Sequence, residues 1–179
     1  MKAMTRRINA ASMFASFLVL AACSTAASPS AATPVTTPGL DTLGAVGPCE
    51  MVDDETRAQF LIGVGHETAE PVVMGARECT WRTADRRVFF LAILPDRMDM
   101  DSVMRGYDHP IATTVAGKRA AQTYSSTAQK DRECLVFVEV AGAQLLNFQY
   151  EPGTEERSST HAQVCEKATS FAERVVASL

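Results

Sequence analysis

His66 and Glu67 are neighbours in the chain, and Glu70 follows shortly after them. A carboxylate beside an imidazole can tune the ring as a base or help it to hold a metal ion, so these residue types could do chemistry here. They lie, however, in residues 63–76, whose glycines and polar side chains predict a loop. A solvated loop explains the group better than an active site does.

The other residues that could catalyse a reaction or bind a metal are scattered along the chain. His109 lies in an expected turn, and His161 lies at the start of an expected helix. Asp96, Asp99 and Asp101 form a loose acidic cluster that lacks the glycine and the terminal glutamate of a calcium-binding loop. The sequence contains no G-x-S-x-G, H-E-x-x-H or Walker motif. We therefore expect no catalytic residue, no metal and no cofactor, and hence no enzyme.

Four cysteines, Cys49, Cys79, Cys134 and Cys165, lie in the second part of the chain. An even number of cysteines in an exported chain is typical of disulfide bonds, and three pairings are possible. Cys134 begins a strand-like apolar run, and Cys165 lies on the apolar face of an expected C-terminal helix, so a bond between them would fasten that helix to the sheet. The spacing contains no C-x-x-C pair, which disfavours a zinc site.

Cys23 differs from the other cysteines because it ends a short apolar run that follows three basic residues. This arrangement is typical of a secretory signal peptide, and the run is too short for a transmembrane helix. Leu20-Ala21-Ala22-Cys23 resembles the bacterial lipobox, in which the peptide is cut before a diacylglycerylated cysteine. We therefore expect a signal peptide at residues 1–22 and a bilayer anchor of acyl chains on Cys23. An ordinary signal peptide with a chance cysteine is the alternative.

Residues 23–46 consist mostly of Ser, Thr, Ala, Pro and Gly, and predict a disordered tether because they bury too little apolar surface to offset their ordering entropy. Loss of residues 1–22 leaves 14 of the 17 basic side chains against 21 acidic ones, a formal charge of −7. Such a charge argues against binding to nucleic acid or to anionic lipid through basic residues. The expected location is the extracytoplasmic face of the cell membrane, with attachment through the acyl chains.

Residues 47–179 predict a single α+β domain. A short helix is expected from Asp53 or Asp54 to near Gly63, and a second short helix within residues 95–110. A long C-terminal helix is expected to begin with a capping box of Thr160 and Gln163. About six strands are expected between these helices, at residues 77–83, 87–94, 112–117, 118–126, 133–140 and 144–150.

The expected strands form three hairpins, which turn at residues 84–86, 117–118 and 141–143. Residues 88–94 are apolar on both alternating faces, so they predict a central strand that is covered on each side. The predicted fold is therefore an antiparallel sheet of about six strands, packed by the short N-terminal helix and the long C-terminal helix and fastened by two disulfides.

The order of the motifs resembles that of a known family. Pro48-Cys49-Glu50 is followed by Cys79-Thr80-Trp81, Val115-Ala116-Gly117 with Ala120, Cys134-Leu135-Val136-Phe137-Val138, and Cys165 with Ala168. This order resembles that of actinobacterial cell-envelope lipoproteins of the Lpr type, which carry only a domain-of-unknown-function label. The resemblance implies an exported, lipid-anchored, disulfide-bonded domain without established catalytic residues. It also favours the pairs Cys49–Cys79 and Cys134–Cys165.

These observations leave two main hypotheses for the function. The first is a non-enzymatic binding module whose partner is an envelope protein, a lipid or a glycan. The alternative is a carrier or sensor of a small apolar ligand or lipid, which would need a dry cavity lined by residues such as Phe89, Met104 and Phe148. Trp81 is expected in the core, and ligand stacking is its less favoured role. An enzyme with an unfamiliar site near His66 or His109 ranks last.

Overall fold

The computed structural model describes residues 43, 45–156 and 158–179. The expected signal peptide, Cys23 and most of the expected tether lie outside the described residues. At the end of the expected tether, Leu43 and Val46 pack against the core, and the carbonyl oxygen of Leu43 accepts a hydrogen bond of 2.7 Å from Nη2 of Arg77. Among the described residues, no helix is long and apolar enough to cross a bilayer.

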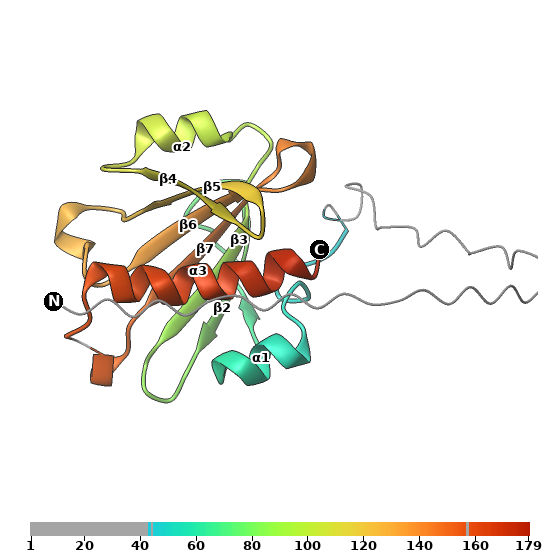
Figure 1. The fold of residues 1–179 in the computed structure, drawn as a ribbon. Coiled ribbons are helices and arrows are strands. Elements are labelled where there is room, and N and C mark those ends of the chain that lie inside the picture. The colour runs from blue at the N-terminus through green and yellow to red at the C-terminus, as the bar shows by residue number, and fades with distance from the viewer. Residues whose placement is uncertain (1–42, 44, 157) are drawn as a thin grey trace, which may run out of the picture. The chain divides into compact units, whose positions relative to one another are not determined.

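Within the described residues, seven strands form one antiparallel sheet in the order β1-β2-β3-β7-β6-β5-β4 (Figure 1). Their bounds are β1 His66–Glu67, β2 Arg77–Arg82, β3 Val88–Ile93, β4 Ile111–Val115, β5 Lys118–Thr123, β6 Cys134–Glu139 and β7 Leu145–Glu151. The six expected strands are present as β2 to β7, and β3 has the inner position that its two apolar faces predict. The additional strand, β1, pairs two residues of the expected loop with the edge of β2.

The described part of the chain also contains three α-helices, α1 Asp54–Phe60, α2 Met100–Gly106 and α3 His161–Ala177. Short 3-10 turns lie at Thr127–Gln129, Ala141–Ala143 and Thr154–Glu156. Each α-helix is preceded by an N-cap residue whose side chain accepts a hydrogen bond from a backbone N–H of the first turn. The N-cap residues of α1, α2 and α3 are Asp53, Asp99 and Thr160. The expected capping box of α3 is confirmed. The expected stop near Gly63 is wrong, because α1 ends at Phe60 and Leu61 takes the left-handed conformation.

The β4–β5 hairpin turns at Ala116 and Gly117, one residue earlier than the sequence predicts. Both residues have positive φ, 47° and 74°, as a two-residue turn that matches the twist of the strands requires. The β6–β7 turn lies at Ala141–Ala143, as expected.

The two faces of the sheet are covered unequally. Along β6, Val136 and Val138 belong to the core cluster beneath α3, whereas Leu135 and Phe137 belong to the cluster beneath α2. α3 lies across β6 and β7 on the first face, and α2 packs on the second face over β5 and β6 (Figure 1). Among the described residues, the short α2 therefore leaves β2, β3 and β7 without a helix over them on the second face, and we call this part the open face of the sheet.

The core beneath α3 is centred on Phe171. Its ring lies 5.2–5.9 Å from the rings of four aromatic residues, Phe60, Trp81, Phe89 and Phe148. All four contacts have the edge-to-face geometry that aromatic pairs favour. This cluster fixes α3 and α1 on the sheet, and it fills the space on this face with side chains.

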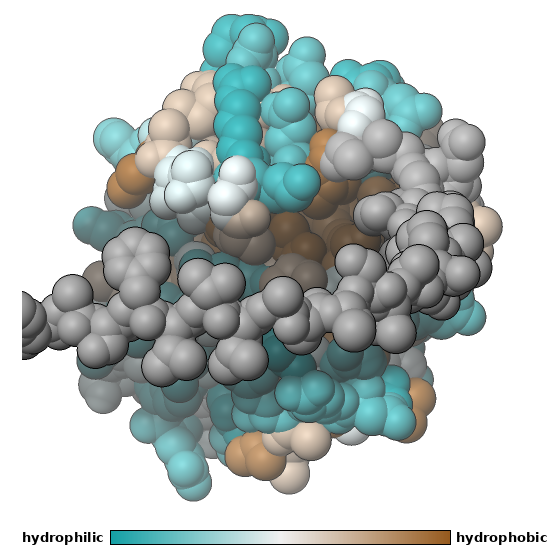
Figure 2. All heavy atoms as spheres, turned by 45° about the vertical axis from the view of Figure 1, so that its right-hand side comes forward, coloured by the Kyte–Doolittle hydropathy of each residue, from teal (hydrophilic) through white to brown (hydrophobic). Residues whose placement is uncertain are grey.

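Two disulfides join the expected pairs. Cys49 and Cys79 have Cα atoms 5.1 Å apart, and Cys134 and Cys165 have Cα atoms 5.0 Å apart. The second bond fastens α3 to β6, as the sequence predicts. Outside the core, hydrophilic side chains predominate on the face drawn in Figure 2, and hydrophobic ones gather in a hollow near its centre.

Candidate binding groove on the open face of the sheet

A groove of about 370 Å³ lies on the open face of the sheet, over β2, β3 and β7. Its apolar surface comes from β3, through Val88, Phe90 and Ala92, which alternate with residues that point toward α3. Val72 and Val73 line it from the segment before β2, and Tyr107 lines it from the end of α2. We refer to this cavity as the groove.

A wider hollow of about 640 Å³ continues from one end of the groove. The two cavities share three lining residues, Ser125, Glu133 and Glu151, so they are adjacent. The outer walls of the hollow are Arg86 in the β2–β3 hairpin, three residues before β6 (Gln129, Asp131 and Arg132), and the segment after β7. The groove is the more enclosed part, and it contains the buried polar groups.

Strand alternation places a row of polar side chains in the groove. On β7, Asn147, Gln149 and Glu151 line the groove, while Leu146, Phe148 and Tyr150 face α3. On β2, Glu78, Thr80 and Arg82 line it in the same way. The register sets Glu78 and Asn147 on either side of Ala92, so polar groups border the apolar surface of β3 on both sides.

Two carboxylates of the groove share one amide. Nε2 of Gln149 donates to Oε1 of Glu151 at 2.9 Å and to Oε2 of Glu133 at 3.3 Å. The other oxygen of Glu133 accepts the backbone N–H of Ser125 at 2.7 Å. Burial raises the pKa of Glu151, and the negative charge of Glu133 raises it further, while Arg82 opposes this shift. The two acids therefore repel each other in a partly desolvated site.

The acids of the groove have no cationic partner among the described residues. The ion pairs of this part of the chain involve other carboxylates, and none includes Glu78, Glu133 or Glu151. Glu78 is 3% exposed and Glu133 is 9% exposed. Carboxylates this buried are ordinarily paired with a cation, because desolvation of an isolated charge is costly.

Asn147 carries an unused hydrogen-bond acceptor beside these acids. The residue is 8% exposed, and its Oδ1 atom has no hydrogen-bond partner among the described residues. A buried polar atom without a partner costs about 1–3 kcal/mol of folding free energy. A hydrogen-bond donor from a bound molecule would recover this cost.

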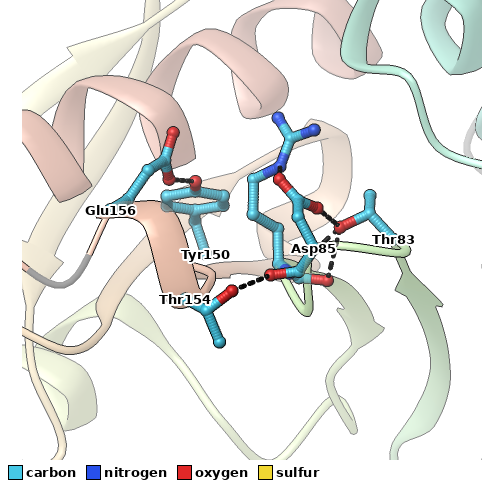
Figure 3. Close-up of polar contacts among 6 residues, drawn as sticks. Thr83, Asp85, Tyr150, Thr154 and Glu156 are labelled. Carbon is cyan, nitrogen blue, oxygen red and sulfur yellow. Dashed lines mark hydrogen bonds and ion pairs between the residues drawn. The ribbon is translucent and has the colours of Figure 1, made fainter.

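The far wall of the hollow is fixed by polar contacts between the β2–β3 hairpin and the segment after β7 (Figure 3). The carbonyl oxygen of Asp85 accepts the N–H of Thr154 at 3.0 Å, and the carboxylate of Asp85 forms an ion pair of 2.8 Å with Arg87. Tyr150 donates its hydroxyl proton to Glu156. Burial and this bond raise the pKa of Tyr150, so it stays protonated and holds the wall in place.

A model of the family described as Protein of unknown function (DUF3558) matches residues 18–178. The chain belongs to this family. No curated protein and no solved structure matches the chain. The expected relation to a family of unknown function is therefore confirmed for this DUF3558 chain, and its envelope-lipoprotein character stays a prediction.

The structure does not bring the expected ligand-binding residues together. Trp81, Phe89 and Phe148 are almost fully buried beneath α3, around Phe171. Met104 belongs to α2 and packs in the cluster on the opposite face of the sheet. Phe89, Met104 and Phe148 therefore do not surround one cavity, and none of the four residues lines the groove.

None of the three histidines lines the groove, although His109 and His161 both lie near the ring of Tyr124. His66 is in β1, and His109 packs near the ring of Tyr124. Nε2 of His161 lies 3.4 Å from Sγ of Cys165, which brings His161, Cys134 and Cys165 within reach of one metal ion. Both sulfur atoms are bonded to each other, however, and metal binding requires them as free thiolates.

No sequence motif identifies the residues that line the groove. Their signal is a pattern rather than a motif: in LLNFQYE of β7, Asn147, Gln149 and Glu151 occupy alternate positions of an otherwise apolar strand. RECTWR of β2 has Glu78, Thr80 and Arg82 at the same spacing. Polar residues on one face of an inner strand indicate that this face is not covered by the core.

Proposed function

We propose that this DUF3558 protein is a lipid-anchored binding module on the extracytoplasmic face of the cell membrane, and that its ligand lies in the groove. The lipobox-like sequence before Cys23 supports the anchor, and the family match, which starts at residue 18, includes this cysteine. The acidic composition supports attachment through acyl chains rather than through basic residues.

The observation that carries the binding site is the unpaired Oδ1 of Asn147, in a groove whose acids form no ion pair among the described residues. Such groups lower the stability of the empty domain, and a ligand with hydrogen-bond donors restores their interactions. A binding site accounts for this arrangement, whereas a purely structural surface would gain stability from apolar side chains at the same positions.

Several features favour binding over catalysis. Neither a histidine nor a cysteine lines the groove. Ser125 contacts Glu133 through its backbone N–H, and no hydrogen bond joins its hydroxyl to this carboxylate among the described residues. The alternative, a carrier of a purely apolar ligand, is less favoured because such a ligand would desolvate Glu78, Glu133 and Glu151 without pairing them.

A pair of matched variants tests the binding site. Thr80 lines the groove, and Thr114 is an exposed residue of the edge strand β4. The full chain, Thr80→Trp and Thr114→Trp are isolated from the envelope under native conditions, and their small-molecule content is compared by mass spectrometry after denaturation. We expect a compound that is present with the native chain and Thr114→Trp and lost with Thr80→Trp. The same content in all three would refute the site.

A separate measurement tests the anchor. The mass of the N-terminal peptide of the mature chain shows whether cleavage occurs before Cys23 and whether this residue carries acyl chains. We expect Cys23→Ala to lose the lipid mass and to leave the membrane fraction. An unmodified Cys23 in a chain that remains in the membrane fraction would exclude the proposed anchor and would leave the groove unaffected.

A further inference from the structure

Building on the proposed binding function, we propose that the groove binds a linear polyamine with an ammonium group at each end. One ammonium group lies near Glu78 and Asn147, and the other lies between Glu133 and Glu151. The methylene chain between them lies over the apolar side chains of β3. This assignment names the ligand chemistry from the unpaired Oδ1 of Asn147 and from acids that form no ion pair among the described residues.

The charge of the groove favours a cation. Three acids and one arginine, Arg82, line it, so a ligand with positive charge relieves the repulsion between Glu133 and Glu151. Both of these carboxylates already accept N–H donors, from Gln149 and, for Glu133, from Ser125. An ammonium group carries three N–H donors, and charge-assisted hydrogen bonds of this kind are about twice as strong as neutral ones.

The spacing of the acids favours two cationic groups on one chain. Glu78 is in register with Ala92, and Glu151 is in register with Val88. A step of four residues along β3 is about 13 Å, and a step of two strands is about 10 Å, so the Cα atoms of the two glutamates lie roughly 16 Å apart. One ammonium cannot pair with both acids at this separation, whereas a spermidine-like chain can reach both ends.

The surface between the two ends favours a methylene spacer. Val88 and Phe90 of β3 lie between the polar rows of β2 and β7, and Val73 and Tyr107 line the same cavity. Methylene groups lose their contact with water when they lie against such side chains, at about 0.8 kcal/mol for each buried CH₂. A ligand with an ammonium group at each end and methylene groups between them therefore matches the order of polar and apolar groups.

A divalent metal ion fits the groove less well. Calcium needs several oxygen ligands that converge at 2.3–2.6 Å. Among the described residues, the acids of the groove do not form a group of three or more ligand atoms close enough to hold one ion. The separated carboxylates and the single amide oxygen of Asn147 suit N–H donors at two places instead.

Isothermal titration calorimetry of the full chain in a non-ionic detergent tests this proposal, with spermidine, butylamine and calcium chloride as probes. The groove variants are Glu78→Gln, Glu133→Gln and Glu151→Gln. The matched control is Glu173→Gln, which removes the same charge from an exposed position of α3. Emission of Trp81, which is fully buried on the other face, verifies that each variant is folded.

We expect saturable binding of one spermidine, weakened about tenfold or more by each groove variant and unchanged in Glu173→Gln. We expect butylamine, with one ammonium group, to bind at least tenfold more weakly. Equal binding by the groove variants and the control would overturn the proposal, because it indicates general attraction to an acidic surface. Tighter binding of calcium that depends on the same glutamates would overturn it in favour of a metal site.

The failure of this inference can be distinguished from the failure of the proposed function. If spermidine does not bind, but a natural compound is lost with Thr80→Trp, the groove is a binding site and the polyamine assignment is wrong. If neither spermidine nor a natural compound depends on the groove residues, both the assignment and the site are wrong.

Discussion

A Cβ atom on Gly153 would lie 2.3 Å from the carbonyl oxygen of Asp85. The backbone of the β2–β3 hairpin and that of the segment after β7 therefore approach each other more closely than any other residue at position 153 allows. The adjacent N–H of Thr154 donates to the same carbonyl oxygen, and the hydroxyl of Thr154 lies 3.4 Å from it (Figure 3). This contact closes the far wall of the hollow that continues from the groove.

We expect Gly153→Ala to lower the free energy of unfolding by about 1–3 kcal/mol, because the added methyl group forces the two backbone segments apart. Urea denaturation of the full chain, followed by Trp81 emission, measures this change. Gly63→Ala is the control, since its added Cβ would meet no atom within 4 Å. Equal effects of the two substitutions would show that the close approach at Asp85 does not contribute to stability.

The disulfides provide a second prediction. We expect Cys134→Ala combined with Cys165→Ala to lower the free energy of unfolding by about 3–4 kcal/mol, because the unfolded chain regains the entropy of an open loop. The sequence separations of the two disulfides, 30 and 31 residues, are nearly equal, so this entropy is nearly equal for the Cys49–Cys79 pair.

The comparison between the two double variants separates entropy from packing. The Cys134–Cys165 bond joins α3 to the core. If its removal lowers the free energy of unfolding more than removal of the Cys49–Cys79 bond does, the difference measures the contribution of that packing. The intact mass of the oxidised chain is the control, and it should be four hydrogens below that of the reduced chain. Free thiols in the oxidised protein would contradict both bonds.

Much of the fold follows from local patterns in the sequence. The two apolar faces of β3 predict its inner position, and the helical spacing around Cys165 predicts that α3 packs on the sheet. β1 could not be predicted in this way, because its two residues carry no strand pattern and pair with β2 only through the edge that β2 offers. α1 ends earlier than predicted because Leu61 adopts the left-handed conformation that we expected near Gly63.

The groove could not be predicted in the same way, because it depends on which face each helix covers. Phe89 and Met104 are both apolar residues of the domain, yet they belong to opposite faces of the sheet. α2 is too short to cover β2, β3 and β7 as well as β5 and β6. No local sequence pattern shows how far a helix extends across a sheet. The polar alternation of β7 is visible in the sequence, but its meaning needs this topology.

The raised pKa of Glu151 provides a prediction about pH. The folded state holds the proton of this carboxyl at higher pH than the unfolded state, whose pKa is near 4.5. The folded state therefore binds more protons in the interval between the two pKa values, and stability falls as pH rises through that interval. The contribution is fully present below the unfolded pKa.

Unfolding of the native chain and of Glu151→Gln in urea, measured from acidic to neutral pH, isolates this contribution. We expect the stability of the native chain relative to Glu151→Gln to decrease with rising pH. In a Glu133→Gln background, the effect of pH on the stability difference made by Glu151→Gln should be smaller. The neighbouring charge that helps to raise the pKa of Glu151 is then absent. A difference that is constant with pH would show that Glu151 titrates alike in both states.

The unpaired amide of Asn147 gives the most direct test of whether the groove exists for a ligand. We expect Asn147→Leu to raise the stability of the ligand-free chain by about 1–2 kcal/mol, because it removes a buried acceptor without a partner at nearly constant volume. The same substitution should weaken spermidine binding about tenfold, since the ligand loses its hydrogen-bond partner.

Gln122→Leu is the contrasting variant. Gln122 is also an amide on a strand, but its Nε2 atom donates to Thr169 of α3 at 2.7 Å. Its replacement should lower the stability and leave spermidine binding unchanged. If Asn147→Leu destabilises the chain as Gln122→Leu does, the amide of Asn147 has a structural partner in solution, and the groove needs no ligand to satisfy it. A gain in stability with a loss of binding would instead identify Asn147 as a residue retained for recognition at a cost to the fold.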